Sequence, residues 1–136
     1  MEIVAADIEL VLQAGELFDA PPTREWTERF LTSAGHHLLA ALENGAVVGF
    51  VSGVETTHPD KGTEMFLYEL SVHPAHRNRG VGRALVGALL ALARECGCHG
   101  MWVGVEPGND AAFATYRAAG AGEPAPAFVL EWRLHT

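Results

Sequence analysis

The chain has 136 residues, of which 49% are hydrophobic and 19% charged, and its formal net charge is -8. This length fits a single domain over residues 1–136, and the apolar content excludes a disordered chain. The acidic charge argues against nucleic acid as a general partner, and no apolar run is long enough to span a membrane.

The first residues are acidic and lack the basic start of a secretory signal, so we expect a cytoplasmic protein. Cys96 and Cys98 are too close in sequence for an unstrained disulfide, and two thiols alone do not make a zinc site. We therefore expect reduced thiols. The seven histidines show no metal-ligand spacing, so no metal site is expected.

Apolar spacing predicts a first helix over residues 7–18, after which "DAPP" interrupts the chain. Thr23 is a typical N-cap for a second helix that ends near "SAGH". Two apolar runs around Asn44-Gly45 predict a β-hairpin over residues 37–55, because this dipeptide suits a tight turn between strands.

Residues 64–72 predict a strand, and residues 80–97 predict a helix with one apolar face. A strand is predicted over 99–106, a short helix over 108–120 and a last strand over 126–134. This order of two helices, a β-hairpin and then β-α-β-α-β predicts an α/β fold with a central mixed sheet and helices on both faces.

The segment Arg77-Asn78-Arg79-Gly80-Val81-Gly82 lies between a predicted strand and a predicted helix. The first N–H groups of a helix have no intrahelical partner, and glycines let an anion approach them, so this turn is suited to phosphate. It lacks the lysine of a Walker loop and the third glycine of a dinucleotide fingerprint. The alternative is a tight turn with its arginines in solvent.

The spacing Arg-x-x-Gly-x-Gly resembles motif A of the GNAT superfamily of N-acetyltransferases. "LSVHPAHR" is similar to the family's strand-end pattern Leu-x-Val-x-Pro-x-x-Arg, and "NDAAFATYRAAGA" to its later pattern around an asparagine, a tyrosine and a glycine. The resemblance covers most of residues 37–134 and implies a GNAT-like fold. The first 36 residues match less well, and the family's opening strand is short or missing there. Thr115 and Ala121 replace large apolar residues of the family.

The resemblance implies acetyl-CoA as co-substrate. Backbone amides from Asn78 to Arg83 would hold its pyrophosphate, and the strand edge at Leu70, Ser71 and Val72 would pair with the pantetheine amides. Asn109 would contact pantetheine or only cap its helix. The residues so assigned to the cofactor are Leu70, Ser71, Val72, Arg77, Asn78, Arg79, Gly80, Val81, Gly82, Arg83, Asn109 and Tyr116.

Acetyl transfer to an amine needs a base for the amine, a donor for the oxyanion and an acid for the departing thiolate. The resemblance implies Tyr116 as the acid, although it could instead be a core tyrosine. The backbone amide of Val72 or Leu70 is the implied oxyanion donor. Glu69 is the first candidate for the base, because a carboxylate on a central strand is costly without a function or a partner. Glu64 is the second candidate, and Glu106 is expected in the same cleft.

Several segments resemble the type I aminoglycoside 3-N-acetyltransferases, which implies a small cationic amine as acceptor and a role in antibiotic resistance. Acidic residues near strand ends and loops agree with a polycation; they are Glu55, Asp60, Glu64, Glu69, Glu106, Asp110 and Glu123. Of these, Glu64, Glu69, Glu106 and Asp110 are the predicted substrate-binding residues. The alternatives are a peptide, protein or polyamine N-acetyltransferase and a non-catalytic acyl-CoA sensor. A homodimer is left open.

Overall fold

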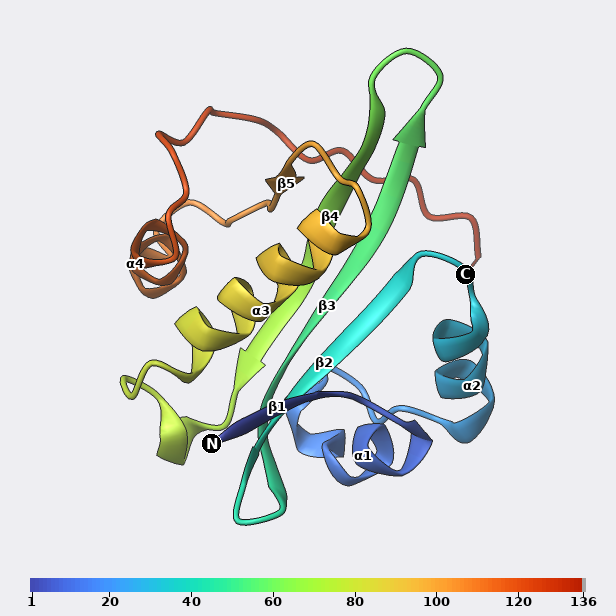
Figure 1. Cartoon of the computed structure of the whole chain (residues 1–136), viewed down its shortest axis with the longest axis vertical. Helices are drawn as coiled ribbons and strands as arrows, with labels where there is room; N and C mark the ends of the chain where they lie inside the picture. The colour runs from blue at the N-terminus through green and yellow to red at the C-terminus, as the bar shows by residue number, and fades with distance from the viewer. Residues whose placement is uncertain (136) are drawn as a thin grey trace.

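The computed structural model describes residues 1–135 and contains one five-stranded sheet in the order β1-β2-β3-β4-β5 (Figure 1). The strands are β1 (Glu2–Ala5), β2 (His36–Glu43), β3 (Ala46–His58), β4 (Gly62–Val72) and β5 (Met101–Trp102). The α-helices are α1 (Ile8–Gln13), α2 (Arg24–Thr32), α3 (Val81–Glu95) and α4 (Asp110–Ala118), with 3₁₀ turns at η1 (Gly15–Leu17) and η2 (Pro74–His76). The predicted α/β class is confirmed.

The sheet is mixed, as predicted. β1 to β4 are antiparallel neighbours, and β5 runs parallel to β4 after the crossover through α3. Asn44 and Gly45 turn the β2–β3 hairpin with φ of 50° and 82°, the left-handed values that such a tight turn requires. The opening strand, which the sequence left unresolved, is present as β1 and pairs with β2 over four residues.

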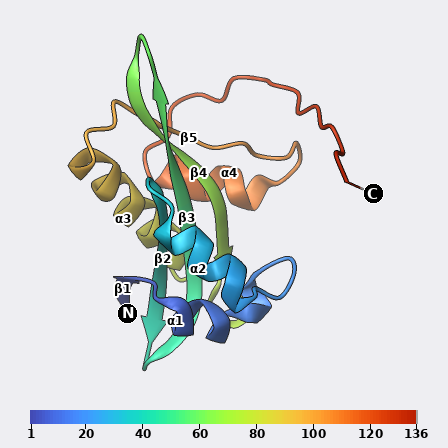
Figure 2. The same cartoon turned by 90° about the vertical axis from the view of Figure 1, so that its right-hand side faces the viewer.

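Helices cover both faces of the sheet (Figures 1 and 2). On one face α3 packs over β2, β3 and β4 through a core that includes Val51, Met65, Leu85 and Leu89. On the other face Val11 of α1 packs with Leu38, Phe50 and neighbouring aromatic rings. β3 is buried from both sides, which makes it the rigid centre of the fold.

A glycine on β3 lets α3 lie close to the sheet. A Cβ at Gly53 would come within 2.9 Å of both Leu89 Cδ1 and Met65 Sδ, in a core where those two side chains are fully buried. Any larger residue would push α3 outward. The close seat of α3 in turn fixes where its two ends lie over the sheet.

Two predicted strands differ from the structure. The strand predicted over 99–106 is present only as Met101–Trp102, and residues 126–134 form no strand. Phe128, Leu130, Trp132 and Leu134 alternate as strand residues do, but they are 72% to 95% exposed and pair with no strand in residues 1–135. Figure 2 shows this segment running away from the sheet. Alternation predicts a strand only where a partner edge lies within reach.

No helix within residues 1–135 is long and apolar enough to cross a bilayer.

Candidate active site

A β-bulge in β4 controls which way its side chains point. Ser52 on β3 pairs with Glu69, whereas the next residue, Gly53, pairs with Leu67, so Tyr68 is an extra residue on β4. Before the bulge Leu67 faces the α3 core, and after it Leu70 does so. Glu69 therefore faces the α1–α2 side, where an unbroken strand would have turned it toward α3.

A wide cleft opens beside the same part of β4. β5 pairs with β4 only at Met65 and Phe66, so the outer edge of β4 beyond Phe66 is unpaired within residues 1–135. Residues 104–106 instead diverge from β4 and form the far side of a cavity of about 1110 Å³. Leu70, Ser71 and Val72 line this cavity. The Val72 carbonyl is occupied by Arg77, and the other backbone groups on the outer edge of β4 are placed where an extended ligand can add as a strand does.

The glycine-rich turn closes one end of the cleft. Asn78 and Gly80 have φ of 61° and 81°, and these two left-handed residues turn the chain sharply into α3. The first backbone bond of α3 runs from the Ala84 N–H to the Gly80 carbonyl, so the N–H groups of residues 81–83 have no intrahelical acceptor. Arg77 Nε donates to the Val72 carbonyl at 3.1 Å and thereby ties the turn to the end of β4.

Helix α4 forms the wall opposite β4. The Asn109 Oδ1 atom accepts a hydrogen bond from the Ala112 N–H at 3.1 Å, so Asn109 caps this helix while also lining the cleft. Gly82 allows α3 and α4 to approach, since a Cβ there would lie 3.3 Å from the Thr115 methyl group. Tyr116, one residue on, lines the same cavity and packs partly against the α3 core.

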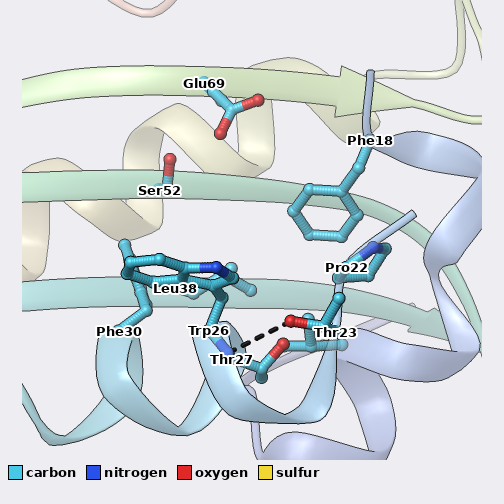
Figure 3. Close-up of a pocket in the computed structure, with 10 residues that line it drawn as sticks. Phe18, Pro22, Thr23, Trp26, Thr27, Phe30, Leu38, Ser52 and Glu69 are labelled. Carbon is cyan, nitrogen blue, oxygen red and sulfur yellow. Dashed lines mark hydrogen bonds between the residues drawn. The ribbon is translucent and has the colours of Figure 1, made fainter. Parts of the chain in front are cut away.

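A second, smaller cavity of about 150 Å³ meets the cleft at Glu69, which lines both. Figure 3 shows Glu69 from β4 and Trp26 from α2 facing this small pocket from opposite sides. Apolar side chains form most of its wall, namely Val11, Phe18, Pro22, Trp26, Phe30 and Leu38. Trp26 is 63% exposed, so much of its ring is free to contact a ligand.

Two titratable groups in these cavities are perturbed. Partial burial raises the pKa of Glu69, and the negative charge of Asp19 adds to the effect. Burial also raises the pKa of Tyr116, which keeps its phenol protonated at neutral pH. The cleft thus holds a carboxylate that is more basic than usual and a protonated phenol, the pair that proton transfer requires.

The structure brings most of the predicted site residues together around the large cavity. Those that line it are Glu69, Leu70, Ser71, Val72, Arg77, Asn78, Gly80, Val81, Gly82, Arg83, Glu106, Asn109 and Tyr116. They come from the end of β4, the turn, the start of α3, the segment after β5, and α4. Residues up to 47 positions apart in the chain, Glu69 to Tyr116, therefore share one cavity.

Three predicted residues do not line either cavity: Arg79, Asp110 and Glu64. Arg79 is in the turn and is exposed, and Asp110 lies in the first turn of α4. Glu64 is at the opposite end of β4 from the cleft and accepts a hydrogen bond from His58 at 3.0 Å. The strand length between Glu64 and Glu69 is what separates them.

The seven acidic residues do not form one ring. Glu55, Glu64 and Glu123 each pair with a cationic or imidazole group of the chain itself, and only Glu69 and Glu106 of the seven line the cleft. Proximity to strand ends could not reveal this, because the two ends of the same strand lie on opposite sides of the molecule.

Sequence reasoning missed several residues of the site. Asp19 lines the cleft and acts on Glu69, although the sequence suggested only a chain break there. Ser52 is 2% exposed, faces the small pocket beside Glu69, and its Oγ has no hydrogen-bond partner within residues 1–135. The signal for Ser52 was present: a serine within the apolar run of a central strand needs a partner.

Comparison with known proteins gives one family. The family model described as acetyltransferase (GNAT) family matches residues 6–121. Among curated proteins, the chain is 34% identical over 102 residues to the L-amino acid N-acyltransferase MnaT of Escherichia coli (strain K12), which covers 75% of this chain and 59% of that protein. The chain thus spans only 50% to 59% of the length of the first curated relatives it matches.

Solved structures share the fold over nearly the whole chain. An aminoglycoside acetyltransferase, HMB0005, from an uncultured soil metagenomic sample superposes with a TM-score of 0.81 at 26% identity, covering 97% of this chain and 98% of that one. AAC(6')-Iy in complex with the bisubstrate analogue CoA-S-monomethyl-acetylneamine gives a TM-score of 0.81 at 21% identity, with 97% of each chain covered.

The influence of Asp19 on Glu69 can be tested directly. Asp19→Asn removes a negative charge that disfavours ionisation of Glu69, so we expect the pKa of Glu69 to fall. The measurement is an NMR titration of the Glu69 side-chain carboxyl. Asp110→Asn is the matched control, because Asp110 lies outside both cavities; an equal shift in that variant would refute a specific effect of Asp19.

Proposed function

The chain belongs to the acetyltransferase (GNAT) family, and from that premise we propose that it transfers an acetyl group from acetyl-CoA to a primary amine of a small cationic acceptor. The observation that carries the proposal is the position of Glu69. This half-buried carboxylate lines both the wide cleft, which suits the cofactor, and the small pocket, which suits an amine.

The residues of the wide cleft fit acetyl-CoA. The free N–H groups at the start of α3 suit a pyrophosphate, with Arg77 and Arg83 beside them, and the unpaired edge of β4 suits the pantetheine amides. When bound there, acetyl-CoA supplies a thioester whose acetyl group an amine can take directly. A metal ion is not needed for this step.

Glu69 is the proposed base. The acceptor arrives as an ammonium ion and becomes a nucleophile only after losing a proton, which Glu69 takes directly or through a water. Its raised pKa makes it a better proton acceptor than an ordinary carboxylate. Ser52 lies opposite Glu69 in the strand pairing, and its free hydroxyl is suited to orient that carboxylate or the water.

Tyr116 is the proposed acid. As the new N–C bond forms and the C–S bond breaks, the departing sulfur takes up negative charge, and the Tyr116 hydroxyl supplies the proton. The backbone N–H of Val72 or Leu70, on the cavity edge of β4, is proposed as the donor to the carbonyl oxygen.

The acidic groups around the acceptor end favour a cation. Asp19, Glu69 and Glu106 line the cleft, whereas the arginines that line it, Arg77 and Arg83, belong to the turn. A polycation such as an aminoglycoside is the first candidate, in keeping with the sequence resemblance and with the similar fold of the aminoglycoside acetyltransferase HMB0005. The sequence resemblance implies acetylation of a 3-amino group, whereas AAC(6')-Iy is named for the 6' position. The position that this chain acetylates therefore has to be determined from the structure of the product.

The small pocket supports a second candidate, an amine that carries a compact apolar group. Six apolar residues line this pocket, including the exposed Trp26 ring. Among residues 1–135 no arginine, lysine or histidine lines it, and the Arg29 guanidinium lies 5.2 Å from the centre of the Trp26 ring. We propose that the enzyme works in the cytoplasm, where acetyl-CoA is available. Peptide and protein acceptors are alternatives, and so is a catalytically silent sensor. The experiments below distinguish them.

Cofactor binding at the turn predicts a charge effect at Gly82. Gly82→Asp should weaken CoA affinity at least about tenfold, because like charges within a few ångströms repel by kilocalories per mole. Gly82→Ala places the same Cβ against Thr115 without the charge and is the matched control. Isothermal titration with CoA gives both affinities. Equal affinities in the two variants would show that the pyrophosphate does not lie at this turn.

The acid role predicts a separation of turnover from binding at Tyr116. Tyr116→Phe removes one hydroxyl and little volume, so we expect turnover to fall by about 10²–10⁴-fold. CoA affinity, measured by titration on the same sample, should stay near that of the wild type. Full turnover in this variant would make Tyr116 a packing residue.

The acceptor can be identified by thiol release from acetyl-CoA with an aminoglycoside, a polyamine, an apolar primary amine and a peptide, each at two salt concentrations. Glu69→Gln should lower kcat for every acceptor that reacts. For a polycation, KM should rise with salt, because salt screens the attraction to the acidic cleft. Trp26→Ala should raise KM for the apolar amine alone, and Trp132→Ala, on the exposed C-terminal segment, serves as the control.

These outcomes separate the candidates. A salt-independent KM with the apolar amine preferred would rule out the polycation. A fully active Glu69→Gln would rule out Glu69 as base. Thiol release with the peptide alone would overturn the small-amine proposal, and CoA binding without thiol release on any acceptor would support the sensor.

A further inference from the structure

A second cluster of reactive side chains lies at the end of α3 that is remote from the glycine-rich turn. His37 near the start of β2, Glu55 on β3 and Cys96 just after α3 offer a nitrogen, an oxygen and a sulfur atom that all lie within 4.8 Å of one another. These residues line neither cavity of the candidate active site. The proposed acetyl transfer therefore does not account for them.

The strands fix the position of two of these side chains. His37 shares the α3 face of β2 with Leu39 and Ala41, and Glu55 shares the α3 face of β3 with Val51 and Gly53. The His37 and Glu55 side chains are each only 23% exposed, and the ring Nε2 lies 2.7 Å from the Glu55 Oε2 atom. This pair is held in place by the sheet before any ligand arrives.

The end of α3 fixes the third side chain. The Cys96 N–H donates to the Leu92 carbonyl at 2.9 Å, Gly97 adopts a left-handed φ of 79°, and the Cys98 N–H returns to the Ala93 carbonyl at 2.9 Å. This helix ending holds the Cys96 thiol over the His37–Glu55 pair. Cys96 is exposed, so solvent can reach the cluster from that side.

We propose that His37, Glu55 and Cys96 bind one zinc ion, with a water molecule in the fourth position. Imidazole, carboxylate and thiolate are the three protein groups that bind Zn²⁺, and the thiolate selects against Mg²⁺ and Ca²⁺. Tetrahedral zinc with bonds of about 2.0–2.3 Å needs its ligand atoms about 3.5 Å apart, so the cluster requires only small side-chain movements.

Proton balance is simple. The Cys96 thiol proton leaves to solvent. The His37 Nε2 proton, which bonds to Glu55 in the metal-free protein, also leaves that atom, and the neutral ring that binds zinc through Nε2 carries its one proton on Nδ1. The metal then replaces the hydrogen bond between His37 and Glu55. Bound zinc joins the end of α3 to β2 and β3, so it should stabilise the folded chain.

This site cannot be recognised in the sequence because its ligands are not spaced as a motif. His37 and Glu55 are 18 residues apart, and Cys96 follows after a further strand and helix. Cys98 lies close to Cys96 in the sequence, but it is not one of the three clustered ligands. It packs partly against the α3 core instead.

The test is a titration of the reduced, CoA-free protein with Zn²⁺ in competition with a chromophoric chelator. The wild type should bind one zinc ion. Cys96→Ser and His37→Gln should each weaken zinc binding at least about tenfold, the range already seen when only an outer-shell partner of a metal ligand is lost. Co²⁺ in place of Zn²⁺ should give a thiolate charge-transfer band in the wild type that is absent in Cys96→Ser.

The chain supplies matched controls. His58 and Glu64 form a second imidazole–carboxylate pair, 3.0 Å apart, that is not part of the three-ligand cluster. His58→Gln and Cys98→Ser should therefore keep the wild-type affinity. Thermal melting without metal shows that each variant folds, and added zinc should raise Tm in the wild type and the two controls only.

Four results would overturn the site. Zinc affinity unchanged in Cys96→Ser, or lost equally in His58→Gln, would mean that the metal binds elsewhere on the surface. If zinc binding were lost in Cys98→Ser and retained in Cys96→Ser, the thiolate ligand would be Cys98 and the proposed site would be wrong. Absence of any binding at micromolar zinc would mean that the cluster is only a hydrogen-bonded pair beside a thiol.

Discussion

The one-residue bulge at Tyr68 is the constraint on which the candidate active site depends. It reverses the facing of β4 partway along the strand, so that Leu67 and Leu70 both pack under α3 while Glu69 turns to the opposite side. In a regular strand Glu69 would face the α3 core, where an unpaired carboxylate is expensive to bury. The bulge also bends the strand where β5 stops pairing with it, which is where the cleft opens. One inserted residue thus turns Glu69, the proposed base, toward the cleft.

The parts of the fold that the sequence predicted are those set by local chemistry. Thr23 and Asn109 cap helices through their own side chains, Asn44-Gly45 takes left-handed angles, and the apolar face of residues 81–95 becomes buried. The prediction of a strand over residues 126–134 was wrong, because alternation indicates which face a strand would bury but not whether a sheet edge is available for pairing. Pairing is a property of two segments, and the sequence presents them one at a time.

The same distinction explains the candidate site. The turn at residues 77–83 was recognisable because the anion site expected there consists of consecutive backbone groups. Three other features could not be recognised: the bulge at Tyr68, the approach of Asp19 to Glu69, and the pairing of Glu64 with His58. Each depends on which residues the fold brings together. The number of acidic residues predicted the sign of the charge in the cleft but not which carboxylates lie there. Three of the seven acidic residues near strand ends and loops pair with the chain's own arginine or histidine side chains. The acidic character of the cleft rests on Asp19, Glu69 and Glu106.

Helix α3 connects the candidate active site with the proposed zinc site. Its fifteen residues extend about 22 Å at 1.5 Å per residue, from the free N–H groups that face the cleft to Cys96 beside His37 and Glu55. Between these ends, Leu85 and Leu89 are fully buried against the sheet, and Gly53 leaves no slack beneath Leu89. A helix seated this closely cannot slide without disrupting a packed core. A metal at its C-terminal end would therefore act on the N-terminal end by holding α3 in place. It would add stability to the scaffold that positions the glycine-rich turn, without changing the shape of that turn.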